Sequence, residues 1–306
     1  SSGGLHVGKR SLLSFTRSQE LSADRAALRY LDLTRQSAKG LVELAQKLRD
    51  QELLTPNYQD PYVRTHPISQ RRFRYLASHL ASSAYTDAPT SNRLKALYLR
   101  IKAKIKSFTQ PTSQTLREYQ SPKPSIQNRY ARTIAYYRQS DLEKSLKLID
   151  GLIEDMPDDA YFHELKGQIL FETGFAKKAL FSYEVAVRLA PEAHLIRADL
   201  GRIQLELNDP NLLPFAIRNF QMSLEKEPKR AFIWRQLGIA LGRLNKMGKS
   251  FRALAEEALL RGRDAEALRL AKKAKNYFHK GSSLWLRSED IIFTLKQKQL
   301  DNQRTK

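Results

Sequence analysis

Apolar residues recur at steps of three and four along most of the chain, which is the spacing of amphipathic helices. In the first part of the chain this pattern predicts helices over residues 17–33, 38–53 and 70–80, and a strongly basic helix over residues 92–108. Three prolines interrupt the pattern within residues 55–69, because proline blocks a continuous helix. We therefore predict an all-α fold.

Local signals predict where these helices begin and what separates them. Thr16 and Gln19 have the spacing of a capping box, which places the start of the first helix at Thr16. Residues 1–13 contain three glycines and are expected to form a flexible lead-in. Residues 82–91 and 109–125 are rich in serine, threonine or proline, and both are predicted to be linkers.

From residue 126 onward the sequence repeats. Pro157 and Pro191 are 34 residues apart, and Pro228 follows 37 residues later. The period, the helix-ending prolines and the small and aromatic positions resemble the tetratricopeptide repeat, in which paired helices stack into a solenoid. The matching residues are Gly167, Ala179, Tyr183, Ala186, Leu200, Gly201, Ala216, Phe220, Trp234, Leu237, Gly238 and Leu241.

The later part of this region departs from the simple period. Three extra residues near 208–211 are expected to lengthen one inter-helix turn. Residues 255–275 resemble a shortened helix–turn–helix unit with Gly262 at the turn, and residues 282–296 are predicted to form a last helix. We predict a tetratricopeptide-repeat domain over 126–296, followed by a flexible tail over 297–306.

Composition limits the classes of function. The chain has 306 residues, no cysteine and a formal net charge of +21. Thiolate metal sites and cysteine nucleophiles are therefore excluded, and no apolar run is long enough for a transmembrane segment. The basic charge permits contact with nucleic acid, but no reader motif accompanies it, so we predict no nucleic-acid partner. The basic helix suits a membrane surface or a partner, although packing on its own domain explains the same pattern.

Two acids in the first helix are candidates for chemistry. Glu20 and Asp24 continue an apolar helical stripe that includes Ala27 and Leu31. Acids on a buried face require a cation, a metal or a hydrogen-bond partner. The alternative is an exposed turn of the helix whose acids are balanced by neighbouring arginines.

Histidine is scarce, with six residues in the chain. No pair has the HExxH spacing that places two zinc ligands on one helical face, and the sequence contains no phosphate loop and no GxSxG elbow. Because catalytic zinc requires three protein ligands, this chain cannot assemble a complete zinc-hydrolase site by itself.

Two segments nevertheless resemble a known family. QELSADRAALRYL, residues 19–31, is similar to the E-x-x-x-D segment of zinc metallopeptidases of the HtpX and CAAX-prenyl-protease type. THPISQRRF, residues 65–73, resembles the later HPxxxxR motif of that family. Tetratricopeptide repeats after the peptidase domain are typical of its BepA-like periplasmic branch. The resemblance implies that residues 1–108 are the C-terminal part of a helical zinc-peptidase domain.

The resemblance also implies functional residues. Glu20 would be a zinc ligand. Asp24, His66 and Arg72 would form the catalytic surroundings, with Asp24 orienting a ligand histidine or pairing with Arg72, and His66 near the metal. Because HExxH is absent, we expect weak or no zinc binding and no proteolysis from this chain alone. The opening sequence lacks Met, and we interpret the chain as the continuation of a longer protein.

The leading prediction is a zinc metalloendopeptidase that acts in quality control of envelope or outer-membrane proteins in the bacterial periplasm. Its partners would be unfolded or misassembled proteins, together with a peptide or protein in the repeat groove. The alternative is a non-catalytic tetratricopeptide-repeat interaction module.

Overall fold

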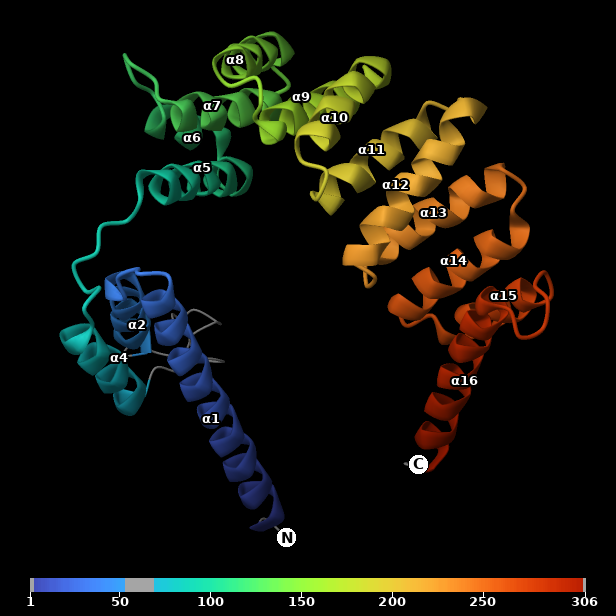
Figure 1. Cartoon of the computed structure of the whole chain (residues 1–306), viewed down its shortest axis with the longest axis horizontal. Coiled ribbons are helices and arrows are strands. Elements are labelled where there is room, and N and C mark those ends of the chain that lie inside the picture. The colour runs from blue at the N-terminus through green and yellow to red at the C-terminus, as the bar shows by residue number, and fades with distance from the viewer. Residues whose placement is uncertain (1–2, 53–68, 305–306) are drawn as a thin grey trace. The chain divides into compact units, whose positions relative to one another are not determined.

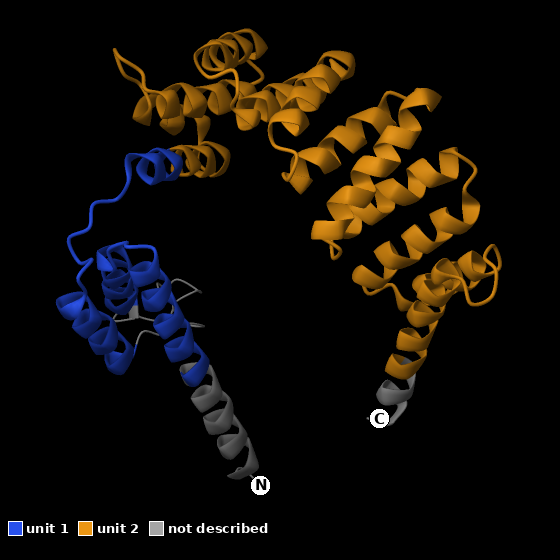
Figure 2. Ribbon diagram, viewed as in Figure 1, with its two compact units in different colours: residues 1–99 blue, residues 100–306 orange. Residues whose placement is uncertain are grey.

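The computed structural model describes the backbone of residues 3–52 and 69–304, and side chains over 18–52 and 69–298 (Figure 1). Every regular element in these ranges is helical, which confirms the all-α prediction. The chain divides into two compact units, residues 1–99 and 100–306 (Figure 2). The domain limits predicted at residues 108 and 126 stay predictions.

The first unit is built from α1 (Gly3–Leu33), α2 (Lys39–Glu52) and α4 (Gln70–Ser82), and it includes the start of α5 (Asn92–Thr109). Its small core joins α1, α2 and α4. The buried apolar residues of this core are Leu28, Ala38, Ala45 and Leu76.

The start of α1 differs from the prediction. The described part of this helix runs from Gly3, so Thr16 lies inside it and is not an N-cap, and residues 3–13 of the predicted lead-in are helical. A capping box is a local signal, and a helix that has already begun passes through it. Ser69, by contrast, is the N-cap of α4, and its side chain accepts a hydrogen bond from the backbone N–H of Arg72 at 3.3 Å.

The second unit contains the end of α5 and ten longer helices in sequential pairs, with one short helix before them. The pairs that match the predicted repeats are α9 with α10, α11 with α12, and α13 with α14. The helices of the unit are α6 (Thr112–Glu118), α7 (Ile126–Arg138), α8 (Leu142–Asp155), α9 (Ala160–Glu172), α10 (Ala176–Leu189), α11 (His194–Glu206), α12 (Leu213–Lys226), α13 (Ala231–Arg243), α14 (Met247–Leu260), α15 (Asp264–Lys275) and α16 (Ser283–Arg304).

The repeat pattern acts through close helix packing. A Cβ added at Gly167 would lie 2.4 Å from the ring of Tyr183, and one at Gly201 would lie 2.9 Å from the ring of Phe220. The same place in the next pair brings Gly238 against Leu254. The small residue of each first helix thus receives the large residue of the second, as the sequence predicted.

A second regularity ties each pair to the one before it. The side chains of His163, Arg197 and Trp234 hydrogen-bond to the carbonyl oxygens of Pro157, Pro191 and Pro228, each at 2.8 Å. Each side chain lies six residues after its proline. His163 therefore has a structural place in the repeat.

Two turns of the second unit agree with the sequence prediction, and two other segments differ from it. The extra residues near 208 form a short 3₁₀ turn over Pro210–Leu212, and Gly262 has the positive φ of a tight turn, at 71°. The linker predicted over residues 109–125 contains the helix α6, which packs on α7. The tail predicted from residue 297 continues α16 to Arg304.

Gly167→Ala is expected to destabilise the second unit by about 1–3 kcal/mol, because the new methyl group overlaps the buried ring of Tyr183. Gly151→Ala is the matched control. Its Cβ would meet only Arg129, at 3.8 Å, and alanine favours a helix interior by about 0.5–1 kcal/mol over glycine. Urea unfolding followed by tryptophan fluorescence measures both. Equal stability of the two variants would contradict the packing described here.

Candidate functional site

Arg72 brings the two candidate motifs of the first unit together. Its Nε and Nη2 donate to the two carboxylate oxygens of Asp24, at 2.7 and 2.8 Å. Its Nη1 lies 3.0 Å from a carboxylate oxygen of Glu20. The acids stand one turn apart on α1, and the arginine lies in the first turn of α4. One guanidinium therefore holds two carboxylates of α1, of which Asp24 lies 48 residues before Arg72 in the chain.

The pair between Arg72 and Asp24 is buried. Arg72 is 8% exposed and Asp24 is 6% exposed, and the two parallel hydrogen bonds give the fork-to-fork geometry in which arginine binds carboxylate most strongly. Of the alternatives for Asp24, the described residues support the pairing with Arg72. The exposed-turn interpretation is wrong for Asp24, because its side chain lies in the interior.

Glu20 lies at the edge of this arrangement. Its side chain is 22% exposed, and it lines a cavity of about 210 Å³ together with Asp24 and Arg72. The remaining wall is apolar and comes mostly from α2. Arg72 thus fixes the orientation of a carboxylate that faces a cavity, which is the arrangement a ligand carboxylate needs.

The described residues do not make up a zinc site. No group of three His, Cys, Asp or Glu side chains within them could hold a metal ion. Both carboxylate oxygens of Asp24 accept hydrogen bonds from Arg72, and the predicted ligand of this cluster is Glu20. His66 lies outside the described residues, so its predicted place near the metal stays a prediction.

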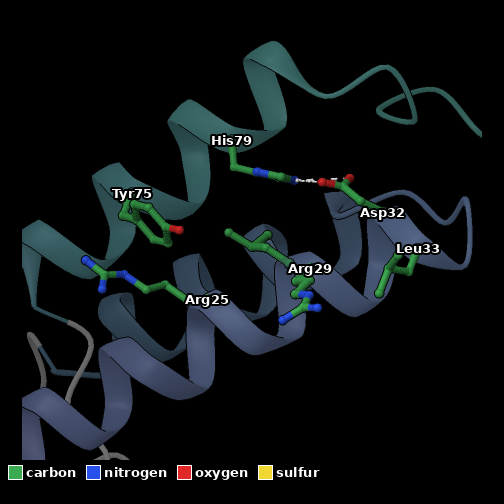
Figure 3. A pocket seen from close by; sticks show the side chains of 7 residues that line it. Arg25, Arg29, Asp32, Leu33, Tyr75 and His79 are labelled. Carbon is green, nitrogen blue, oxygen red and sulfur yellow. Dashed lines mark hydrogen bonds and ion pairs between the residues drawn. The ribbon is translucent and has the colours of Figure 1, made fainter.

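The sequence did not indicate a second polar cluster at the far end of the same helices. His79 on α4 lies 3.2 Å from the carboxylate of Asp32 on α1 (Figure 3). Ser83 donates a hydrogen bond to the same carboxylate at 2.9 Å. Both side chains contact Asp32, so the cluster joins the ends of α1 and α4 and does not form a serine–histidine relay. Partners 47 residues apart leave no local signal.

The second unit contains a half-buried carboxylate, Asp199, among charged neighbours. Burial raises the pKa of Asp199 to about 6, against 3.8 ordinarily, and Glu164 and Glu172 add to the rise. Arg202 and Lys104 act in the opposite direction. Because the folded pKa lies above the unfolded one, this group contributes stability below about pH 3.8 that is lost as the pH rises through about 6.

Asp199→Asn is expected to remove this dependence. The unfolding free energy of wild type minus that of the variant should fall by about 1–2 kcal/mol between pH 5 and pH 7.5. Urea unfolding at both pH values measures the difference, and Asp158→Asn, at an exposed position, is the control. A difference that does not change with pH would show that Asp199 is not desolvated.

Comparison with known proteins agrees with the division of the chain into two units. Residues 3–80 match the model of Peptidase family M48. The chain is 26% identical over 144 residues to DnaJ homolog subfamily C member 3 of Gallus gallus, covering 47% of this chain and 27% of that protein. It is 32% identical over 87 residues to tetratricopeptide repeat protein 33 of Homo sapiens, covering 28% of this chain and 32% of that protein. The chain thus spans about a third or less of these relatives.

Among solved structures, a MamA structure ("MamA MSR-1 C2") is 16% identical with a TM-score of 0.46, and the alignment covers 56% of this chain and 98% of that one. YrrB, described as a TPR protein with an unusual peptide-binding site, is 18% identical with a TM-score of 0.46, covering 62% and 98%. Within the described ranges, no helix is both long and apolar enough to span a membrane.

Residues 3–80 of the first unit are thus similar to Peptidase family M48. The paired helices of the second unit, with a small residue of one packed against a large residue of the other, form a tetratricopeptide-repeat unit.

Proposed function

We propose that this chain forms part of a zinc-dependent metalloendopeptidase in which Glu20 is one of the zinc ligands. The observation that carries the proposal is the contact of the Arg72 guanidinium with the carboxylates of Asp24 and Glu20. It joins the two motif segments and orients Glu20 toward a cavity. Arg72 and Asp24 are positioning residues in this proposal, and His66 belongs near the metal. The match of residues 3–80 to Peptidase family M48 supports the proposal.

The repeat unit would hold the polypeptide substrate or a partner protein. Stacked helix pairs present extended binding surfaces, which suits unfolded or misassembled chains. Quality control of envelope or outer-membrane proteins in the bacterial periplasm is the setting we propose. It rests on the resemblance to the periplasmic branch of the family.

The coding sequence that precedes Ser1 tests the proposal. An in-frame HExxH segment upstream would supply the two histidine ligands and the general-base glutamate that the described residues do not contain. A stop codon followed by a ribosome-binding site directly before Ser1 would contradict the proposal.

The second candidate function is a non-catalytic interaction module. The observation that favours it is the lack of a three-ligand metal cluster in the part of the chain that the structure describes. A zinc-free protein that binds partners through its repeats, with the first unit as a structural remnant, would then be expected. Chelator-sensitive cleavage of casein by the whole gene product would exclude this function.

A further inference from the structure

A cavity of about 530 Å³ lies in the second unit where α12, α13, α14 and α16 meet. One wall is apolar and includes Leu224 and Leu237, with Trp234 beside them. The indole of Trp234 is held in place by its hydrogen bond to the carbonyl of Pro228. The fixed ring gives the cavity a rigid apolar surface next to polar groups.

Arg252 of α14 forms the polar side of this cavity. It is 8% exposed, and its guanidinium lies 5.2 Å from the centre of the Trp234 ring. Its Nε is buried and has no hydrogen-bond partner among the described residues. Its recorded ion pair is with Glu256, at 3.5 Å, which is long for a charge-assisted hydrogen bond. A buried guanidinium with an unused donor is costly unless an acceptor reaches it.

A second cation stands close by. Arg287 of α16 is exposed and lines the same cavity. The burial of Arg252 lowers the pKa of its guanidinium, and the positive charge of Arg287 lowers it further. Glu256 offsets part of this charge, and the exposed Glu225 lies at the rim. Two arginines beside the apolar wall of this cavity favour a bound anion that also carries an apolar group.

We propose that this cavity binds a carboxylate of an extended polypeptide, with an apolar side chain of the same polypeptide against Trp234. The carboxylate is the C-terminus of the bound chain or an Asp or Glu side chain within it. The planar guanidinium of Arg252 receives it, and Arg287 closes over it from α16. The inference deepens the polypeptide-binding part of the proposed function and does not depend on zinc chemistry.

Three fluorescently labelled peptides test this site by fluorescence anisotropy with the full chain. Two have the sequence GSGF and one has the sequence GSDFG. The first has a free C-terminal carboxylate, the second is its C-terminal amide, and the third is the amide of GSDFG. The first or the third is expected to bind at least about tenfold more tightly than the second. Tight binding of the first identifies a C-terminal ligand, and tight binding of the third identifies a side-chain ligand. Equal affinity for all three, or no binding by about 1 mM, would overturn the proposal.

Two variants locate the binding. Arg287→Ala changes an exposed residue and is expected to weaken binding of the preferred peptide by about threefold to tenfold, with unchanged helicity. Arg252→Gln should weaken it by more than about tenfold, because it removes the buried charge. Arg235→Ala, at an exposed position on α13 outside the cavity lining, is the control. Undiminished binding by the folded Arg287→Ala and Arg252→Gln variants would place the peptide elsewhere and overturn the site.

Because this assay measures affinity and not cleavage, its failure is distinct from a failure of the peptidase proposal. If the chain shows no proteolysis but binds the acid more tightly than the amide, the carboxylate proposal stands and the peptidase proposal fails. If the chain is a peptidase but binds all three peptides equally, the carboxylate proposal fails.

Discussion

Arg72→Met is expected to destabilise the first unit by about 3–5 kcal/mol. The substitution leaves the Asp24 carboxylate buried without the guanidinium that balances its negative charge. Removing one member of a buried ion pair costs far more free energy than the intact pair contributes. Asp24→Leu combined with Arg72→Met should recover part of the loss, because the double change removes both charges from the interior. Arg72→Lys should fall between, since an ammonium group lacks the two-pronged geometry.

The two units allow the effect to be localised. Both tryptophans, Trp234 and Trp285, belong to the second unit, so tryptophan fluorescence should report normal folding of the repeats in the variant. Hydrogen exchange of peptides from residues 18–52 should show the loss of protection. Arg71→Met changes an exposed neighbour on the same helix and is the control. Equal protection in Arg72→Met and Arg71→Met would show that the buried pair does not stabilise this unit.

The repeats could be predicted from sequence because their packing is local and periodic. Gly167 and Tyr183 are 16 positions apart, and the same combination of a small and a large residue returns in the next pair. Equivalent positions in successive repeats make equivalent contacts, so a residue pattern that recurs in several copies predicts the packing of each helix pair. The lengthened turn near residue 208 was visible for the same reason, as an interruption of the period.

The first unit was less accessible because its important contacts are not periodic. Glu20 and Asp24 on one stripe suggested a buried cation, but spacing alone also allowed an exposed charge pair. The family resemblance allowed Asp24 to pair with Arg72 or to orient a ligand histidine, and the structure shows that Arg72 lies against both acids. The contact of His79 with Asp32 had no signal in the sequence, since partners from separate helices meet through tertiary packing.

The cavity beside Trp234 has no signal in the sequence for a different reason. Trp234 matches the repeat pattern, and its indole donates a hydrogen bond to the carbonyl oxygen of Pro228. The same ring also lies over Arg252, which comes from the following helix. A residue that satisfies a packing pattern can therefore contribute its other face to a binding site, and a pattern search does not reveal this.

Glu20→Gln is expected to abolish zinc-dependent proteolysis by the whole gene product, with a fall of at least about 100-fold. The amide keeps the shape of the side chain and an oxygen for Arg72, but it removes the negative charge that a zinc ligand supplies. The repeats and the pair between Arg72 and Asp24 should stay folded. The loss would therefore concern the metal and not the stability of the unit. Glu43→Gln, at an exposed position on α2, is the control.

The most direct measurement is zinc content and chelator-sensitive casein cleavage of the whole gene product, compared between wild type, Glu20→Gln and Glu43→Gln. If Glu20 is a zinc ligand held by Arg72, wild type and Glu43→Gln will contain one zinc ion per chain and cleave casein, and Glu20→Gln will lose both. Undiminished zinc content and cleavage in Glu20→Gln would show that this carboxylate is not a ligand.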